Sequence, residues 1–519
     1  MAAGFLARPP GPPAGRKPPF YGGIRSLCRD FLAGRPILSA LLFSLCAIAL
    51  ADERPNIVMI VVDDMRMDEF GAGGHTYLET PHIDSLAANG AMFANAYNVT
   101  PLCSPNRASI LTGQFVSRHG ILDNTSRAHA SHQLDLFAKN LQSAGYRTAH
   151  IGKWHMGNDP TPRPGYDYWV SFAGQGKTYD PELYEDGGLR KVDGYITDIF
   201  TERAVDYIRE SARGERPFFV YIGHKAIHPE AVQREDGTVD RSVPMEFIPA
   251  ERHKDFYKGK VFERRPTATD LIEGRIRKPV LKAALRERDD LVKRDASWVS
   301  WTDPGVAELT VQRRAEMMLA VDESVGRLLG ALEESGQLEN TLILFTSDNG
   351  YFFGEHALSV ERRLPYEESV LAPLLVQYPK RVEGGRQIDG IVLSIDYAAT
   401  VLDAAGIAVP GHVQGRSFLP MVAGEVDHVR DSAYVEFYSH ENPFPWTAKL
   451  DYRVVRTGDF KYIRWIRFDE DVGMELYNLR ADPYEQNNLA YDPGYAESLR
   501  SLQKTLKAMM IESFGLSDE

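Results

Sequence analysis

The chain has very few cysteines: three in 519 residues, at positions 28, 46 and 103. Cys28 and Cys46 lie in the first fifty residues, whose composition differs from that of the rest. If that segment is removed, only Cys103 remains, and no intramolecular disulfide is possible. A lone cysteine in an exported chain is either a buried spectator or a functional atom. Its neighbours decide between the two.

Long apolar runs are also lacking. The run at residues 37–50 follows six Lys or Arg and one Asp and ends in Ala49-Leu50-Ala51. It is short for a membrane span. A basic flank, a short apolar stretch and a small-x-small site predict a secretory leader, residues 1–51, cleaved after Ala51. We therefore expect a secreted or periplasmic protein without stable membrane association. A retained anchor is the alternative, because the basic region is unusually long.

Positive charge is in deficit. The net charge is −13, and loss of the leader, with its six basic residues and one acid, makes it −18. So acidic a surface argues against nucleic acid or an anionic membrane as the main partner. An anionic substrate must then be received by a local cluster of cations. The length and the 43% hydrophobic content suit a soluble enzyme with one large domain and a smaller one.

Apolar runs alternate with helical periodicity over most of the chain. Strands are predicted at 56–62, 146–151, 217–222 and 341–346, and helices at 83–89, 198–210 and 307–335. This alternation predicts an α/β sandwich with a large, mostly parallel sheet between helices. Residues 229–300 are charged and irregular. We interpret them as an insertion near the active-site mouth, with one helix over 267–292.

The texture changes after about residue 425. Short strands are predicted at 434–437, 452–456, 461–465 and 475–478, followed by a helix at 495–510. Successive short strands indicate a small antiparallel sheet with a helix. The predicted organisation is therefore a leader at 1–51, an N-terminal domain at 52–424 and a C-terminal subdomain at 425–519.

Two pairs of oxygen-bearing residues end apolar strands: Asp63-Asp64 and Asp348-Asn349. In open α/β sheets, ligands bind outside the carboxyl ends of the strands. Carboxylate and amide oxygens brought together there would suit Ca²⁺ or Mg²⁺. Either pair alone is explained as well by a helix or turn cap.

Residues 103–113, CSPNRASILTG, carry the most specific pattern. They resemble the signature of type I sulfatases, in which Cys-x-Pro-x-Arg followed by Leu-Thr-Gly directs oxidation of the cysteine to formylglycine. Asn106 stands where the family usually has Ser. The alternative is a buried structural cysteine in a loop.

The resemblance extends from Arg54 to Leu489. Its further elements are GKWHMG at 152–157, KAIH at 225–228, SDNG at 347–350 with GEH at 354–356, and the segment 476–489. It implies an alkaline-phosphatase-like sandwich in which 52–424 is the sulfatase catalytic domain. Residues 165–179 resemble bacterial aryl- or N-acetylglucosamine-6-sulfatase-like members.

The resemblance also implies roles. Formylglycine at position 103 is hydrated to a diol: one hydroxyl attacks sulfur and the other later expels sulfate. One Ca²⁺, with Mg²⁺ the less expected ion, is held by Asp63, Asp64, Asp348, Asn349 and the modified Cys103. Arg107 holds the diol, Lys153 binds a sulfate oxygen, His155 is the base and His228 the acid for the leaving group. A formylglycine-generating or anaerobic maturation enzyme is the implied partner.

One departure concerns Arg362. The family commonly has a lysine there, before Tyr-Glu-Glu-Ser, which binds sulfate and assists protonation of the leaving group. Arginine binds sulfate in a bidentate manner but is a poor proton donor. We therefore predict that His228 carries the proton alone, or that the leaving group is easier to expel. Alternatively, Glu361 pairs with Arg362 and leaves it structural.

The substrate follows from weaker signals. We expect a sulfated small molecule or saccharide, preferably a carbohydrate sulfate such as a GlcNAc-6-sulfate or a polysaccharide sulfate. Trp446 and Trp465 are candidates for stacking on sugar rings. Two other functions stay open: a phosphodiesterase or phosphonate monoester hydrolase of the same superfamily, and a non-catalytic carbohydrate-binding relative.

Overall fold

The structure, a computed structural model, describes residues 54–243, 245–268, 277–298, 308–358, 361–439 and 444–515. All of them belong to one compact unit that begins at Arg54. The predicted leader lies outside the described residues. Among the described helices, none is long and apolar enough to cross a membrane.

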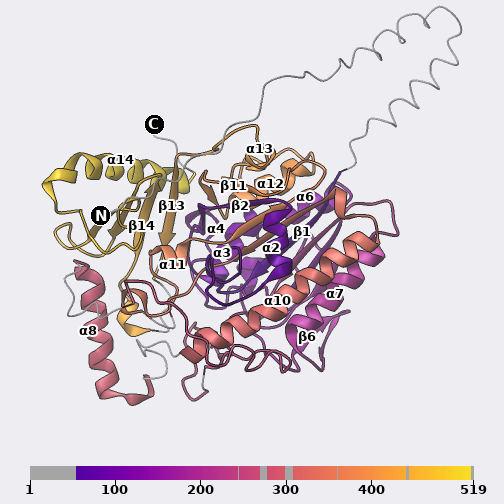
Figure 1. The fold of residues 1–519 in the computed structure, drawn as a ribbon, viewed down its shortest axis with the longest axis horizontal. Coiled ribbons are helices and arrows are strands. Elements are labelled where there is room, and N and C mark those ends of the chain that lie inside the picture. The colour runs from indigo at the N-terminus through magenta and orange to yellow at the C-terminus, as the bar shows by residue number, and fades with distance from the viewer. Residues whose placement is uncertain are drawn as a thin grey trace, which may run out of the picture. The chain divides into compact units, whose positions relative to one another are not determined.

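An eight-stranded sheet forms the centre of this unit (Figure 1). In spatial order its strands are β11 (Arg386–Ile388), β2 (Ala91–Phe93), β10 (Leu374–Gln377), β9 (Thr341–Ser347), β1 (Asn56–Val62), β8 (Phe218–Gly223), β4 (Arg147–Gly152) and β5 (Tyr168–Val170). Strand β10 runs antiparallel to both of its neighbours, and all other pairs are parallel. The predicted mostly parallel sheet is confirmed.

Side chains of β1 alternate between two cores, as a strand buried on both faces requires. Ile57, Met59 and Val61 pack with α3 (Cys103–Thr112), α6 (Phe137–Ser143) and α12 (Asp396–Ala404). Val58, Ile60 and Val62 pack with α2 (Pro81–Ala88), α7 (Ile196–Ser211) and α10 (Glu308–Glu334), and α7 and α10 lie side by side (Figure 1). The sheet is therefore covered by helices on both faces, which is the predicted sandwich.

The C-terminal part forms a four-stranded antiparallel sheet with one helix, as predicted. Its strands are β13 (Ser432–Phe437), β14 (Tyr452–Thr457), β15 (Phe460–Trp465) and β16 (Met474–Asn478), and its helix is α14 (Ala496–Ser513). Short elements complete the described chain: β3 (Ala96–Tyr97), β12 (Val392–Leu393), β6 (Glu182–Glu185), β7 (Gly188–Lys191), α4 (Val116–His119), α5 (Ala128–His132), α11 (Glu367–Val370) and α13 (Leu419–Ala423).

The helix predicted over 267–292 was placed too early. Helix α8 spans Pro279–Arg294, and Thr267 lies in a turn. A proline is well tolerated at the first position of a helix and poorly inside one, so Pro279 marks the start. Residues 269–276 lie outside the described part.

Helix α8 is anchored by a buried lysine. Lys278 directly precedes it, and its ammonium lies 3.7 Å from Glu475 Oε2 and 3.6 Å from the ring centre of Tyr366. Burial lowers the pKa of Lys278, while Glu475 favours its charged form. Glu475 also accepts hydrogen bonds from Trp465 Nε1, Tyr366 and Tyr477. The lysine therefore ties α8 to strand β16.

Replacing Lys278 with methionine is expected to destabilise the protein by about 3 kcal/mol, because it leaves a buried carboxylate without its cation. Chemical denaturation measures this. Lys282→Met, on the first turn of the same helix and only partly buried, is the control and is expected to change the free energy of unfolding by less than about 1 kcal/mol. Equal effects of the two variants would contradict the anchoring role.

Candidate active site

The ends of four neighbouring strands supply most of the site. Asp63 and Asp64 follow β1, Asp348 and Asn349 follow β9, Lys153 and His155 follow β4, and His228 lies shortly after β8. These strands are parallel, so their carboxyl ends meet at one edge of the sheet. Residues spread over nearly 300 positions are thereby brought together.

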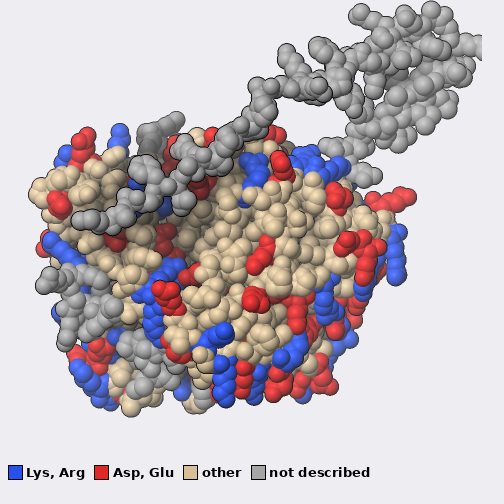
Figure 2. All heavy atoms as spheres, viewed as in Figure 1, with Lys and Arg blue, Asp and Glu red and all other residues tan. Residues whose placement is uncertain are grey.

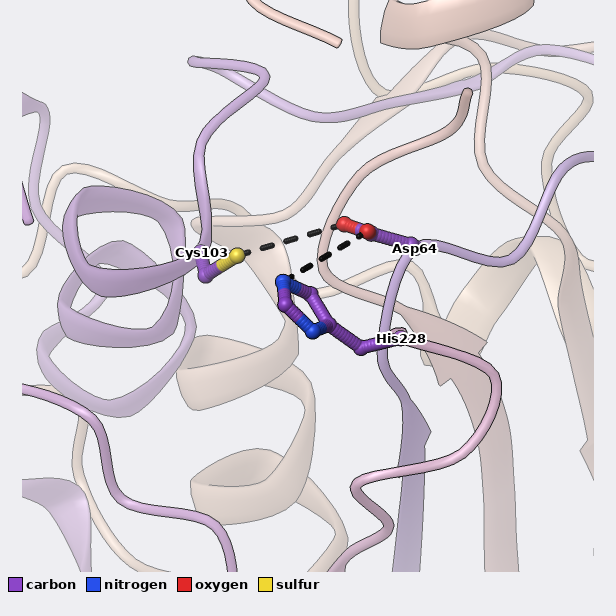
Figure 3. Close-up of side chains that lie close together, drawn as sticks. All are labelled: Asp64, Cys103 and His228. Carbon is purple, nitrogen blue, oxygen red and sulfur yellow. Dashed lines mark hydrogen bonds and ion pairs between the residues drawn. The ribbon is translucent and has the colours of Figure 1, made fainter. Parts of the chain in front are cut away.

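Cys103 is the first residue of helix α3, and its thiol faces the strand ends. Its Sγ lies 4.0 Å from Asp64 Oδ1, and His228 Nε2 lies 3.9 Å from the other oxygen of the same carboxylate (Figure 3). The cysteine is fully buried, and burial raises the pKa of its thiol well above the usual value. The thiol therefore stays protonated, and a thiolate nucleophile is disfavoured.

Several oxygens of the site accept no hydrogen bond from any described residue. They are Asp63 Oδ1, Asp64 Oδ2 and Asn349 Oδ1, all buried. Oxygens of Asp63 and Asp348 lie within 4.8 Å of each other and of the Cys103 sulfur. Buried carboxylates so close together require positive charge. An all-oxygen donor set of this kind fits a hard divalent cation.

Three cations surround the acids. Arg107 Nε donates to Asp348 Oδ2 at 2.7 Å and Nη1 donates to the backbone oxygen of Lys153 at 2.8 Å. The Lys153 ammonium pairs with Asp63, and Arg362 Nε lies 3.2 Å from Asp64 Oδ1. Against the cost of burial, Lys153 and Arg107 hold the pKa of Asp63 well below its usual value. Arg362 thus lies in the site, although Glu361 pairs with the neighbouring Arg363 at 3.3 Å.

His228 is held in one tautomer. Its Nδ1 lies 2.7 Å from the backbone oxygen of Pro229, which only accepts, and its Nε2 lies 3.1 Å from Arg362 Nη2, which only donates. Nδ1 therefore carries the hydrogen and Nε2 is the acceptor. Burial and the Lys153 charge lower the pKa of His228 well below its usual value. To act as an acid, His228 must first gain a proton at Nε2.

A cavity of about 390 Å³ opens beside these residues. Gln175, His228 and Arg362 line its inner part. Segment 230–246 of the predicted insertion contributes Ala231, Gln233, Val239 and Met245, and Pro229, Arg363 and Phe444 complete the wall. The cavity therefore joins charged groups to a partly apolar wall, as binding of a charged group attached to a larger body requires.

Comparison with known families decides the identity. The sulfatase family profile matches residues 55–407, more than half of the chain. The chain belongs to the sulfatase family. A second profile, N-sulphoglucosamine sulphohydrolase C-terminal, matches residues 354–512. The enzyme is thus a sulfatase, as the signature at 103–113 predicted.

Individual sulfatases resemble the whole described chain. An N-acetylglucosamine-6-O-sulfatase of Bacteroides thetaiotaomicron is 32% identical, with 90% of each chain covered. The human N-acetylglucosamine-6-sulfatase is 28% identical over 85% of this chain and 82% of its own. A structure solved with its substrate D-glucosamine-2-N,6-O-disulfate superposes with a TM-score of 0.73 at 30% identity, covering 90% of this chain and 99% of the other.

The phosphonate monoester hydrolase of Agrobacterium radiobacter shares the fold, with a TM-score of 0.64 at 21% identity over 89% of this sulfatase and 96% of the other chain. This likeness concerns the architecture alone. The charge pattern is also relevant to partners: on the part of the face described in Figure 2, basic and acidic side chains are intermixed and form no continuous basic field.

Some site residues were not predicted from the sequence. Gln175 and Gln233 contact Lys153 and His155, yet neither stands in a pattern typical of chemistry. The departure at Asn106 has a structural reason, because its amide donates to the backbone oxygen of Asp348 at 2.7 Å and to Asn98 at 2.8 Å. An asparagine therefore supports the second acidic pair.

The suggestion that Trp446 and Trp465 stack on sugar is wrong for Trp465. That side chain is fully buried and donates to Glu475 at 2.9 Å. Trp446 packs against Trp298 and Phe444, of which only Phe444 reaches the cavity. Both tryptophans are therefore packing residues, since a buried indole has no free face for a sugar.

Proposed function

We propose that this sulfatase releases inorganic sulfate from a 6-O-sulfated, glucosamine-type saccharide, with Cys103 oxidised to formylglycine and one Ca²⁺ bound. The observation that carries the proposal is the position of Cys103. It opens helix α3 within the sulfatase signature, next to the acids that end β1 and β9. The glucosamine-type substrate follows from what the similar sulfatases are named for.

The residues present fit both groups. Asp63, Asp64, Asp348 and Asn349 would hold the Ca²⁺, whose charge supplies orientation and polarisation of the sulfate. The hydrated aldehyde of formylglycine supplies the nucleophilic oxygen that a protonated, buried thiol lacks. Lys153 and Arg362 neutralise the sulfate oxygens. Arg107 fixes Asp348 through its Nε and therefore orients a metal ligand as well.

The cavity suits one sugar residue at the reacting end. Its volume of about 390 Å³ lies near the lower limit for small-molecule sites. Gln175 and Gln233 offer hydrogen bonds, while Val239, Met245 and Phe444 offer an apolar wall. Sugars need this combination, because their rings have apolar faces and polar edges.

Export and maturation complete the proposal. We infer that residues 1–51 direct the chain out of the cytoplasm, with cleavage after Ala51, and that a formylglycine-generating or anaerobic maturation enzyme modifies Cys103. The chain that remains has Cys103 as its only cysteine. Oxidation of this residue therefore competes with no intramolecular disulfide.

Purified protein, produced with a maturation enzyme, tests the function. Peptide mass spectrometry reports the state of Cys103, and sulfate release is measured on defined glucosamine 6-sulfates, other sulfated sugars, an aryl sulfate and an aryl phosphodiester. We expect the highest kcat/KM on a glucosamine 6-sulfate. Preference for the phosphodiester, an unmodified thiol in active enzyme, or inactivity on every sulfate would contradict the proposal.

Calcium binding is expected to tighten as pH rises through about 7. Burial, with repulsion from Asp63 and against the attraction of Arg107, raises the pKa of Asp348 to about 7. Below that pH a proton competes with the metal, and the affinity should fall by up to about tenfold per pH unit. Titration calorimetry on metal-free protein measures this. Asp348→Asn, the control, should bind more weakly and without the pH dependence; identical profiles would exclude Asp348 as a ligand.

A further inference from the structure

Two glutamines link the ammonium group of Lys153 to the imidazole of His155. Lys153 Nζ donates to Gln175 Oε1 at 2.7 Å, and Gln175 Nε2 donates to Gln233 Oε1 at 3.2 Å. The same Gln233 oxygen lies 3.3 Å from His155 Nε2. The four residues come from three segments: Lys153 and His155 follow β4, Gln175 follows β5, and Gln233 belongs to segment 230–246.

The direction of this hydrogen-bond chain is fixed at both ends. An ammonium group has donors only, so Gln175 turns its oxygen to Lys153 and its NH₂ group to Gln233. At the other end, Gln233 Nε2 donates to the backbone oxygen of Gly237 at 2.9 Å, and a carbonyl only accepts. Gln233 Oε1 is therefore an acceptor. The His155 nitrogen that faces it must carry a hydrogen.

We propose that Gln175 and Gln233 are positioning residues that hold His155 with its hydrogen on Nε2 and leave Nδ1 as the nitrogen that accepts a proton. The inference rests on the proposed function and names the nitrogen of the base. His155 Nδ1 is buried and makes no hydrogen bond within the described part of the chain. Ser104 Oγ, beside Cys103, donates to the His155 backbone oxygen at 2.5 Å. The backbone of the histidine is thus tied to the start of α3.

Segment 230–246 is therefore part of the catalytic centre as well as of the cavity wall. Backbone bridges Glu230–Glu246 and Gln233–Val239 hold it as a hairpin-like unit. Its Gln233 faces His155 and also lines the cavity. A positioning role and a saccharide contact make different predictions. The first affects every substrate, whereas the second affects only those that fill the cavity.

The experiment compares Gln233→Ala and Gln233→Glu on a glucosamine 6-sulfate and on 4-nitrophenyl sulfate, using full-length matured enzyme. Gln233→Ala is expected to lower kcat by about 10- to 100-fold on both substrates, with KM changing by less than about threefold. Gln233→Glu keeps an acceptor oxygen in place and should recover about tenfold of the loss. Glu235→Ala, exposed in the same segment, should retain wild-type rates.

Failure of this inference differs from failure of the proposed function. Wild-type enzyme inactive on both sulfates would overturn the function and the inference with it. With active wild type, three results would overturn the inference alone: full kcat of Gln233→Ala on the aryl sulfate, a loss confined to KM for the saccharide, or no recovery in Gln233→Glu. Gln175→Met breaks the other link and should reproduce the loss in kcat, so the test also stands if Gln233→Ala folds poorly.

Discussion

Replacing Cys103 with alanine is expected to lower sulfate release by at least about 1,000-fold, because no other described side chain in the site supplies the attacking oxygen. The protein should still fold. The cysteine side chain is small, and the salt bridges of Arg107 and Lys153 do not depend on it. Initial rates on a saccharide sulfate, with thermal unfolding of both proteins, measure the effect.

Cys103→Ser is the matched variant, and it separates the diol chemistry from a simple nucleophile. A serine can attack sulfur but has no second hydroxyl with which to expel the sulfate. We therefore expect a single turnover and a protein whose mass has increased by one sulfate group. Multiple turnovers by Cys103→Ser, or full activity of Cys103→Ala, would contradict the role given to this position.

The sheet was predictable because its signals are local. The run 56–62 is apolar throughout, which is typical of a parallel strand buried on both faces, and the structure places it as β1 at the middle of the sheet. The acids at 63 and 64 then had to lie at the carboxyl edge. The antiparallel strand β10 could not be predicted in the same way, since strand direction depends on the path of the connecting chain and not on the strand's own residues.

The site was predictable only where a residue type has few other uses. Two acidic pairs at strand ends and a cysteine in a long signature are such cases. Gln175 and Gln233 are neutral amides in loops, and only their hydrogen bonds to Lys153 and His155 reveal them. The hydrogen on Nδ1 of His228 is likewise set by Pro229 and by Arg362, which is 134 positions away in sequence. Tautomers follow from neighbours in space.

His228→Ala is expected to slow the hydrolysis of saccharide sulfates by about 10²- to 10⁴-fold while slowing aryl sulfates much less. A sugar alkoxide is a poor leaving group and needs a proton as it departs, whereas a nitrophenolate leaves without one. Arg362 cannot supply the proton, because its pKa is raised further by the acids around it. Steady-state rates over a series of leaving groups measure the difference.

Arg362→Gln provides the contrast. It removes a cation next to Asp64 but no proton donor, so it should raise KM for saccharide and aryl sulfates alike. The donation from Arg362 to His228 Nε2 also predicts an order of events: the two side chains must separate before the histidine can take up and deliver a proton. If His228→Ala kept its full rate on saccharide sulfates, or lost equally on both classes, the acid would have to be another group and the departure at Arg362 would carry no mechanistic consequence.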